Sequence, residues 1–132
     1  MHPSKHLARA LEDIRRPDLY IQIILVPHSE NERALATAEC QMNAGFPVPG
    51  TFKIRVTPHL WEALTHDECD GIILHELAHI LAFEAGEKAD HGHIWHAICC
   101  RLGGYTKRNT PLGAELRLNA AIAAHRKAKS CD

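Results

Sequence analysis

Residues 65–86, THDECDGIILHELAHILAFEAG, contain the most informative pattern of this chain. Thr65 followed three residues later by Glu68 forms a capping box, which is typical of the start of a helix. From Ile72 to Phe83 apolar residues occur around nearly the whole circumference of that helix, so we expect it to be buried at the centre of the domain. Gly86 is a natural residue for its C-terminal end.

The middle of this helix carries the motif HExxH, as His75, Glu76 and His79. Histidines four residues apart lie on one helix face, one turn apart, so both imidazoles can reach the same metal ion. Glu76 is rotated by roughly 100° from His75 and can hold a water at an open coordination position. This arrangement is typical of zinc hydrolases, which need a third protein ligand from elsewhere.

HExxH is a short motif, and a chain with 11 histidines can contain it by chance. The alternative is a helix with two histidines and a glutamate that bind nothing. However, an unpaired carboxylate and two imidazoles would be costly to bury in so apolar a segment. A metal ion offsets that cost, so the sequence favours a site for one Zn²⁺ ion.

The third ligand has several candidates. A metzincin would have glycine at position 82 and histidine at 85, and the chain has Ala82 and Ala85 instead. A gluzincin would use a glutamate from a following helix, but Glu84 and Glu87 lie too near the end of the same helix to fold back easily, and Glu115 is distant. A reversal of the chain at Gly86 can bring a second histidine cluster over the helix. The members of this cluster are His91, His93 and His96.

HELAH followed by His91-Gly92-His93-Ile94-Trp95 resembles the SprT-like (Spartan-type) zinc metalloprotease domain, which pairs HExxH with a later HGxxW or HGxxF element. The resemblance covers about residues 20–105. It implies that His75, His79 and His91 are the zinc ligands and that Glu76 is the catalytic base for a zinc-bound water. The four-cysteine zinc ribbon of longer members is not seen, so we expect a minimal zincin-like core.

Two further residues are candidates for stabilising the transition state or supporting the site. His96, one helical turn beyond His93, could face the cleft and stabilise an oxyanion or orient a ligand. Tyr105 follows a glycine pair and could donate a hydrogen bond to the tetrahedral intermediate. The remaining histidines are expected at the surface: His2, His6, His28, His59, His66 and His125.

The rest of the chain predicts an α+β fold with an N-terminal helix, a three-stranded sheet, the HExxH helix, a following helix and a long C-terminal helix. Ser4 is expected to cap the first helix, which ends near Arg16. Residues 45–50 are expected to form a turn or loop, and 34–42 are ambiguous between helix and strand. The clearest elements are strands at 20–26 and 51–57 and helices at 92–102 and from Thr110-Pro111 to about Lys129.

The length and composition are those of one globular domain spanning residues 1–132. No segment reaches the roughly 18 apolar residues of a membrane span, and the N-terminus lacks the apolar core of a secretory signal. We therefore expect a cytoplasmic protein with no membrane contact. The 5 cysteines form no CxxC pair, which argues against a disulfide framework or a zinc ribbon.

The charge of the chain is unevenly distributed. Residues 101–131 contain 7 of its 15 Lys and Arg and a single acid, Glu115. Such a basic third could contact DNA, or it could be an ordinary solvated helix face. The residues of this candidate patch are Lys107, Arg108, Arg126, Lys127 and Lys129.

These observations leave three functions open. The first is a zinc metallopeptidase that cleaves protein or peptide substrates, with DNA association as a further expectation, and in which strand 51–57 aligns the peptide as an added strand. The second is a nucleic-acid- or protein-binding module stabilised by zinc, without peptidase activity. The third is a zinc hydrolase of non-peptide amides. Glu76 favours an enzyme, because a purely structural zinc site gains nothing from a base beside the metal.

Overall fold

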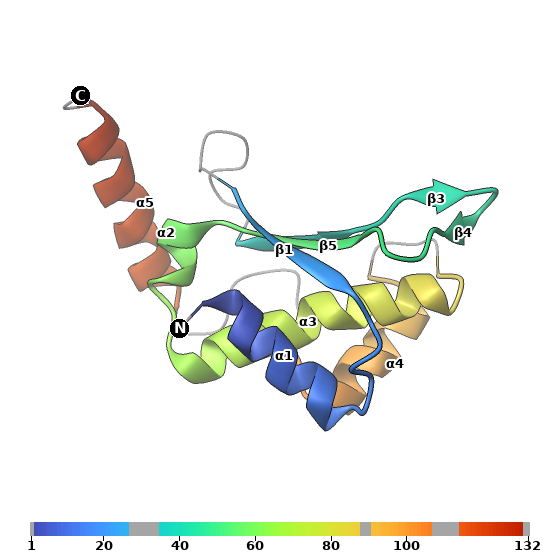
Figure 1. Ribbon diagram of the computed structural model, residues 1–132. Coiled ribbons are helices and arrows are strands. Elements are labelled where there is room, and N and C mark those ends of the chain that lie inside the picture. Colours follow the sequence, from blue (N-terminus) through green and yellow to red (C-terminus); the bar gives the residue numbers. More distant parts are fainter. Residues whose placement is uncertain (1, 27–34, 88–90, 107–113, 131–132) are drawn as a thin grey trace.

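The computed structural model describes residues 2–26, 35–87, 91–106 and 114–130 and has the predicted α+β architecture. A sheet lies over helix α3 (His66–Glu84), and helices α1 (Pro3–Asp13) and α4 (His93–Leu102) pack against the same helix (Figure 1). Helix α5 (Glu115–Ser130) instead contacts the short helix α2 (Pro58–Trp61), which the sequence did not predict. The HExxH helix is therefore covered on several sides.

The sheet has three strands in the order β1 (Ile21–Leu25), β5 (Phe52–Val56), β2 (Ala36–Glu39). β5 runs parallel to β1 and antiparallel to β2, so the ambiguous segment 34–42 contains the third strand. The expectation that strand 51–57 adds a substrate peptide is wrong, because this strand is central and both of its edges are paired. The alternation of apolar and polar residues in this strand indicates which face is buried. It does not indicate whether the strand lies at the edge or in the centre of the sheet.

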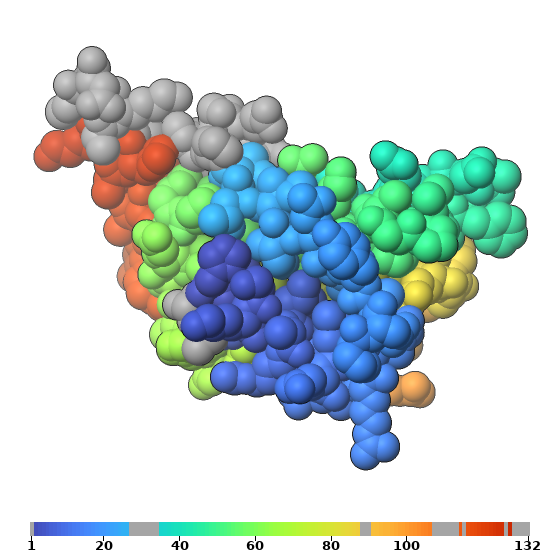
Figure 2. Space-filling view, in the orientation of Figure 1, coloured from blue at the N-terminus to red at the C-terminus, as the bar shows by residue number. Residues whose placement is uncertain are grey.

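A small hairpin, β3 (Met42–Asn43) with β4 (Phe46–Pro47), occupies part of the segment that was expected to be only turn or loop. Ala44 and Gly45 between the strands have φ values of 52° and 85°. Two consecutive residues with positive φ form the type I′ turn that suits the twist of a tight hairpin. The hairpin extends beyond the body of the molecule, and its β4 strand contacts α3 (Figures 1 and 2).

The helix ends follow from local chemistry. α1 begins at Pro3 and is capped by His2, whose Nδ1 accepts from the Ser4 amide at 3.1 Å, so the prediction of Ser4 as the cap is wrong. Proline suits the first helical position because it has no N–H to satisfy there. For α3 the predicted capping box of Thr65 is present, and Gly86 follows the helix with a φ of 90°. The predicted start of the last helix, Thr110-Pro111, lies outside the described residues.

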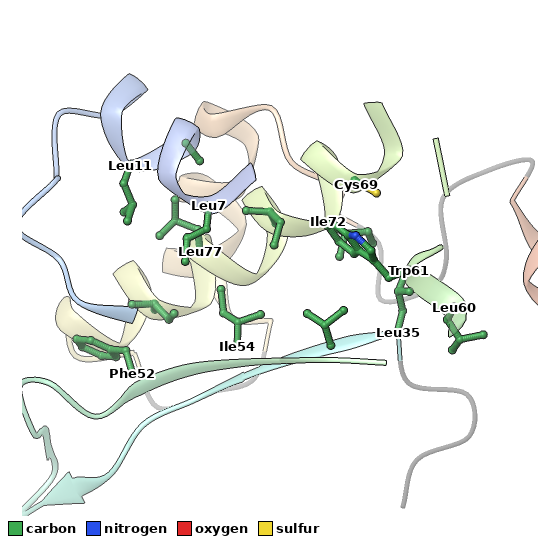
Figure 3. Packing of buried hydrophobic residues seen from close by; sticks show 14 of the residues in the cluster. Leu7, Leu11, Leu35, Phe52, Ile54, Leu60, Trp61, Cys69, Ile72 and Leu77 are labelled. Atoms are coloured by element: carbon green, nitrogen blue, oxygen red, sulfur yellow. The ribbon is translucent and has the colours of Figure 1, made fainter. Parts of the chain in front are cut away.

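The main core lies between α1, α3 and the sheet (Figure 3). Leu7 and Leu11 of α1 and Ile54 of β5 belong to the same buried cluster as Ile72 and Leu77 of α3. The predicted burial of the HExxH helix is confirmed. Across the described part of the chain, no helix is both long and apolar enough to cross a membrane.

His6 is a correction to the expectation that the outlying histidines lie at the surface. Its exposed fraction is 2%, and it lies in the interface between α1 and α3. The buried residues of α1 are Pro3, His6, Leu7, Ala10 and Leu11. His6 thus occupies a position in the helical stripe of buried residues, and this spacing was the signal that could have identified it.

Candidate metal centre

The side chains of His75, His79 and His91 converge on one point. The first two lie one turn apart on α3, and the third comes from the connection between α3 and α4. The Nε2 atom of His91 is 3.2 Å from that of His79 and 3.3 Å from that of His75. Within the described residues, this is the group of three whose ligand atoms all lie close enough to hold one metal ion.

The residues present fit zinc. Tetrahedral coordination with Zn–N bonds of 2.0–2.1 Å places ligand nitrogens about 3.3–3.4 Å apart, close to the spacing of these Nε2 atoms. The Nδ1 atom of His75 donates to the carbonyl of Tyr105 at 2.5 Å, which leaves a lone pair on its Nε2 facing the group. This lone pair is available to a cation held by the group.

His91 follows the end of α3 in sequence, yet its side chain lies beside His75 and His79 of that helix. Gly86 allows the helix to end with the Glu87 amide bonded back to the Ala82 carbonyl at 2.9 Å. His91 itself has a φ of 54°, and Gly92 caps α4. A side chain at Gly92 would collide with the carboxylate of Glu87. That carboxylate is the far end of a flexible side chain and can move aside, so the contact favours glycine at position 92 without requiring it.

Among the three ligands that the sequence left open, His91 is the one that joins the group. His93 is exposed on the first turn of α4. His96 is also exposed, and its ring nitrogens lie 3.8 and 3.9 Å from the sulfur of Cys100. Its expected role at an oxyanion stays a prediction.

Trp95 contacts all three histidines of the group. Its exposed fraction is 2%, and its Nε1 donates to the backbone carbonyl of His75 at 3.2 Å. Its ring centroid lies 4.9 Å from that of His75, 5.0 Å from that of His79 and 4.5 Å from that of His91. The tryptophan of the HGxxW element therefore restricts the orientation of every candidate ligand.

Glu76 lies beside the group without belonging to it. Its exposed fraction is 5%, and its Oε1 is 3.9 Å from the Nε2 of His75. The described residues contribute three candidate ligands to this group and no fourth His, Cys, Asp or Glu. Three protein ligands with an open position are typical of catalytic zinc sites, whereas structural sites usually have four.

Tyr105 contacts the group through its backbone. Its carbonyl accepts from His75 Nδ1 and from the sulfur of Cys99, the latter at 3.3 Å. Gly104 makes this approach possible, because a Cβ there would lie 2.9 Å from the His75 amide nitrogen. The tyrosine ring lies against Gly71, and burial raises the pKa of its phenol. The expected hydrogen bond from the phenol to an intermediate stays a prediction.

The basic C-terminal patch is described only in small part. Lys107 and Arg108 lie outside the described residues, as do the side chains of Arg126 and Lys129. Lys127 is exposed on α5. Arg117, on the same helix, donates to the Glu68 carboxylate at 2.7 Å and to the Ala63 carbonyl at 2.8 Å, which ties α5 to the start of α3.

Comparison with known proteins gives one match. The model of the SprT-like family matches residues 26–120, which include all three histidines, Glu76 and Trp95. No curated protein and no solved structure matches the chain.

Proposed function

The chain belongs to the SprT-like family, and from this premise we propose that it is a zinc-dependent metallopeptidase that cleaves protein substrates. The observation that supports the proposal most is the convergence of three imidazole nitrogens from HExxH and the HG element, with a buried glutamate beside them. A three-ligand group with an adjacent base is the composition of a hydrolytic zinc site.

Each residue of the centre has a task in this proposal. His75, His79 and His91 hold the ion through their Nε2 atoms. When bound, zinc would lower the pKa of a coordinated water from about 15.7 towards 7 and polarise the peptide carbonyl. Glu76 accepts the proton of the attacking water and passes it to the leaving amine. The Tyr105 carbonyl keeps the His75 ring in the orientation that this chemistry needs.

We propose that the substrate peptide is aligned by β2 and not by β5. Among the strands that the structure describes, β2 lies at one end of the sheet order, and it contacts α3, the helix that carries HExxH. An extended peptide could pair with its outer edge through backbone hydrogen bonds. Methylation of peptide-bond nitrogens near the cleaved bond should then slow cleavage more than an equal change of side-chain size. Equal cleavage of methylated and unmethylated peptides would exclude this alignment.

The proposal is tested by Glu76→Gln. The variant should keep one equivalent of zinc and lose cleavage of an unfolded protein substrate by at least about 100-fold, because general-base catalysis contributes about 10²–10⁴. His93→Ala, at an exposed site on α4, is the matched control and should keep both properties. Wild-type protein that binds zinc but cleaves no protein substrate would contradict the proposal and favour the zinc-stabilised binding module.

Contact with DNA is a separate proposal that rests on the charge of residues 101–131. Binding through lysine and arginine to phosphates releases counterions, so the affinity should fall steeply between low and physiological salt. Replacing Lys127, exposed on α5, together with Lys129 by alanine should reduce this salt dependence. An affinity that does not change with salt would exclude an electrostatic DNA contact.

A further inference from the structure

A cavity lies near the beginning of α3, about two helical turns before His75. Its volume is about 390 Å³, within the range of small ligand sites. Half of the residues that line it are apolar, namely Pro3, Leu25, Pro58, Trp61 and Leu64. The polar half consists entirely of residue types that bind transition metals, namely His2, His6, Glu62, His66 and Cys69.

His6 is the buried member of this set. The exposed fraction of its side chain is 1%, and its Nδ1 lies 2.5 Å from a carboxylate oxygen of Asp70 on α3. Asp70 therefore holds the ring with Nδ1 as the donor, and in the neutral imidazole Nε2 is an acceptor. This Nε2 is buried and has no hydrogen-bond partner among the residues that the structure describes. A buried acceptor without a hydrogen-bond partner is unfavourable, and a ligand bound to it would offset this cost.

The Asp70–His6 pair has the form seen at metal-binding histidines, which usually donate their second ring nitrogen to a carboxylate or carbonyl. In the first centre, His75 does the same with the Tyr105 carbonyl. A second imidazole is already close, since the ring centroids of His6 and His66 are 5.7 Å apart. The three histidines of the first centre have centroid separations of 4.6–5.3 Å, so the His6–His66 pair is only slightly wider.

We propose that His6 and His66 bind a second divalent transition-metal ion, with His2 as the third ligand. His2 lines the same cavity, is exposed, and uses only its Nδ1 in capping α1. Exposed side chains change rotamer on the picosecond to nanosecond scale, so this ring can turn towards the ion. An imidazole-rich set of this kind suits zinc, copper or nickel.

Cys69, which also lines the cavity, is a weaker candidate for the third ligand than His2. Burial raises the pKa of the Cys69 thiol to about 11, so this sulfur carries its proton at neutral pH and is a poorer ligand. Among the described residues, the group of three whose ligand atoms already lie close together is the first centre. The ligand atoms of the proposed second site must therefore move closer to one another when an ion binds. We therefore expect the second ion to bind more weakly than the first.

Zinc chloride alone is a sufficient probe, with bound metal measured after equilibrium dialysis. Wild-type protein should bind two equivalents, and His66→Ala, a change at an exposed position, should bind one. His93→Ala is the matched histidine control and should bind two. His91→Ala should lose the tight equivalent and keep the weaker one, so the second site can be counted even if the proposed peptidase function fails.

Asp70→Asn tests the orienting role of the carboxylate. It should weaken the second equivalent by about 10- to 100-fold, the usual effect of removing such a partner, and leave the first unchanged. With cobalt(II) as the probe, the visible absorption of the second equivalent should disappear in His66→Ala and persist in His93→Ala. A wild-type stoichiometry of one, or a second equivalent that survives His66→Ala unchanged, would overturn the proposal.

Discussion

Replacement of Trp95 by phenylalanine should weaken both the fold and the metal centre. The substitution removes the hydrogen bond from Nε1 to the His75 carbonyl, worth about 1 kcal/mol. It also leaves part of the indole volume empty at a site that is 2% exposed, which costs about 1–2 kcal/mol more. The free energy of unfolding should therefore fall by about 2–3 kcal/mol, or the melting temperature by about 6–12 °C in a chain of this size.

The effect on zinc distinguishes support of the ligands from simple core packing. Because the indole contacts all three histidine rings, Trp95→Phe should lower the affinity for the first zinc equivalent by about tenfold. Trp61→Phe is the matched control, since Trp61 is 5% exposed and belongs to the main core. It should lower the melting temperature without changing that affinity. Competition with a chelator measures the zinc affinity of both variants. A destabilised Trp95→Phe variant with the zinc affinity of the wild type would refute the proposed support of the ligands by Trp95.

Two other predictions concern stability and reactivity. The hydrogen bond from Arg117 lowers the pKa of Glu68 below its ordinary value of 4.5, so the pair stabilises the fold above that pH and the contribution is lost as the pH falls through the lowered value. Arg117→Ala should thus lower the melting temperature more at neutral pH than below the lowered pKa of Glu68, where only the hydrogen bond to the Ala63 carbonyl is still lost, as calorimetry can show. Burial raises the pKa of both Cys69 and Cys99 to about 11, whereas Cys100 is exposed. Iodoacetamide should therefore label Cys100 in the native protein and spare the two buried thiols, and mass spectrometry of the labelled peptides would reveal the opposite pattern.

The elements that the sequence predicted well are those with a strong local signal. Thr65, Glu68 and Gly86 fix the ends of α3 by capping chemistry that involves only neighbouring residues. The alternation in β5 likewise identifies its buried face. The position of β5 at the centre of the sheet has no local signal, because it depends on β1 and β2 pairing with it from segments distant in sequence. The peptide-alignment hypothesis failed for that reason.

The same distinction applies to the metal centre. His75, Glu76 and His79 share one helix, so their spacing alone predicts that they lie together. His91 is nearby in sequence, but spacing could not separate it from His93 and His96, since the choice depends on the path of the backbone at His91, where φ is positive.

The groups that orient the ligands were the least predictable, because they act through the backbone. The Tyr105 carbonyl reaches His75 only because Gly104 allows close approach, and a carbonyl leaves no mark on side-chain patterns. The partner of His6 was hidden in a different way, since Asp70 is 64 residues away in sequence. In both cases a histidine ring is fixed through Nδ1 by an oxygen that only the tertiary fold supplies. A search for metal centres in this fold should therefore ask which imidazoles have an oxygen on Nδ1, and not only which imidazoles are close together.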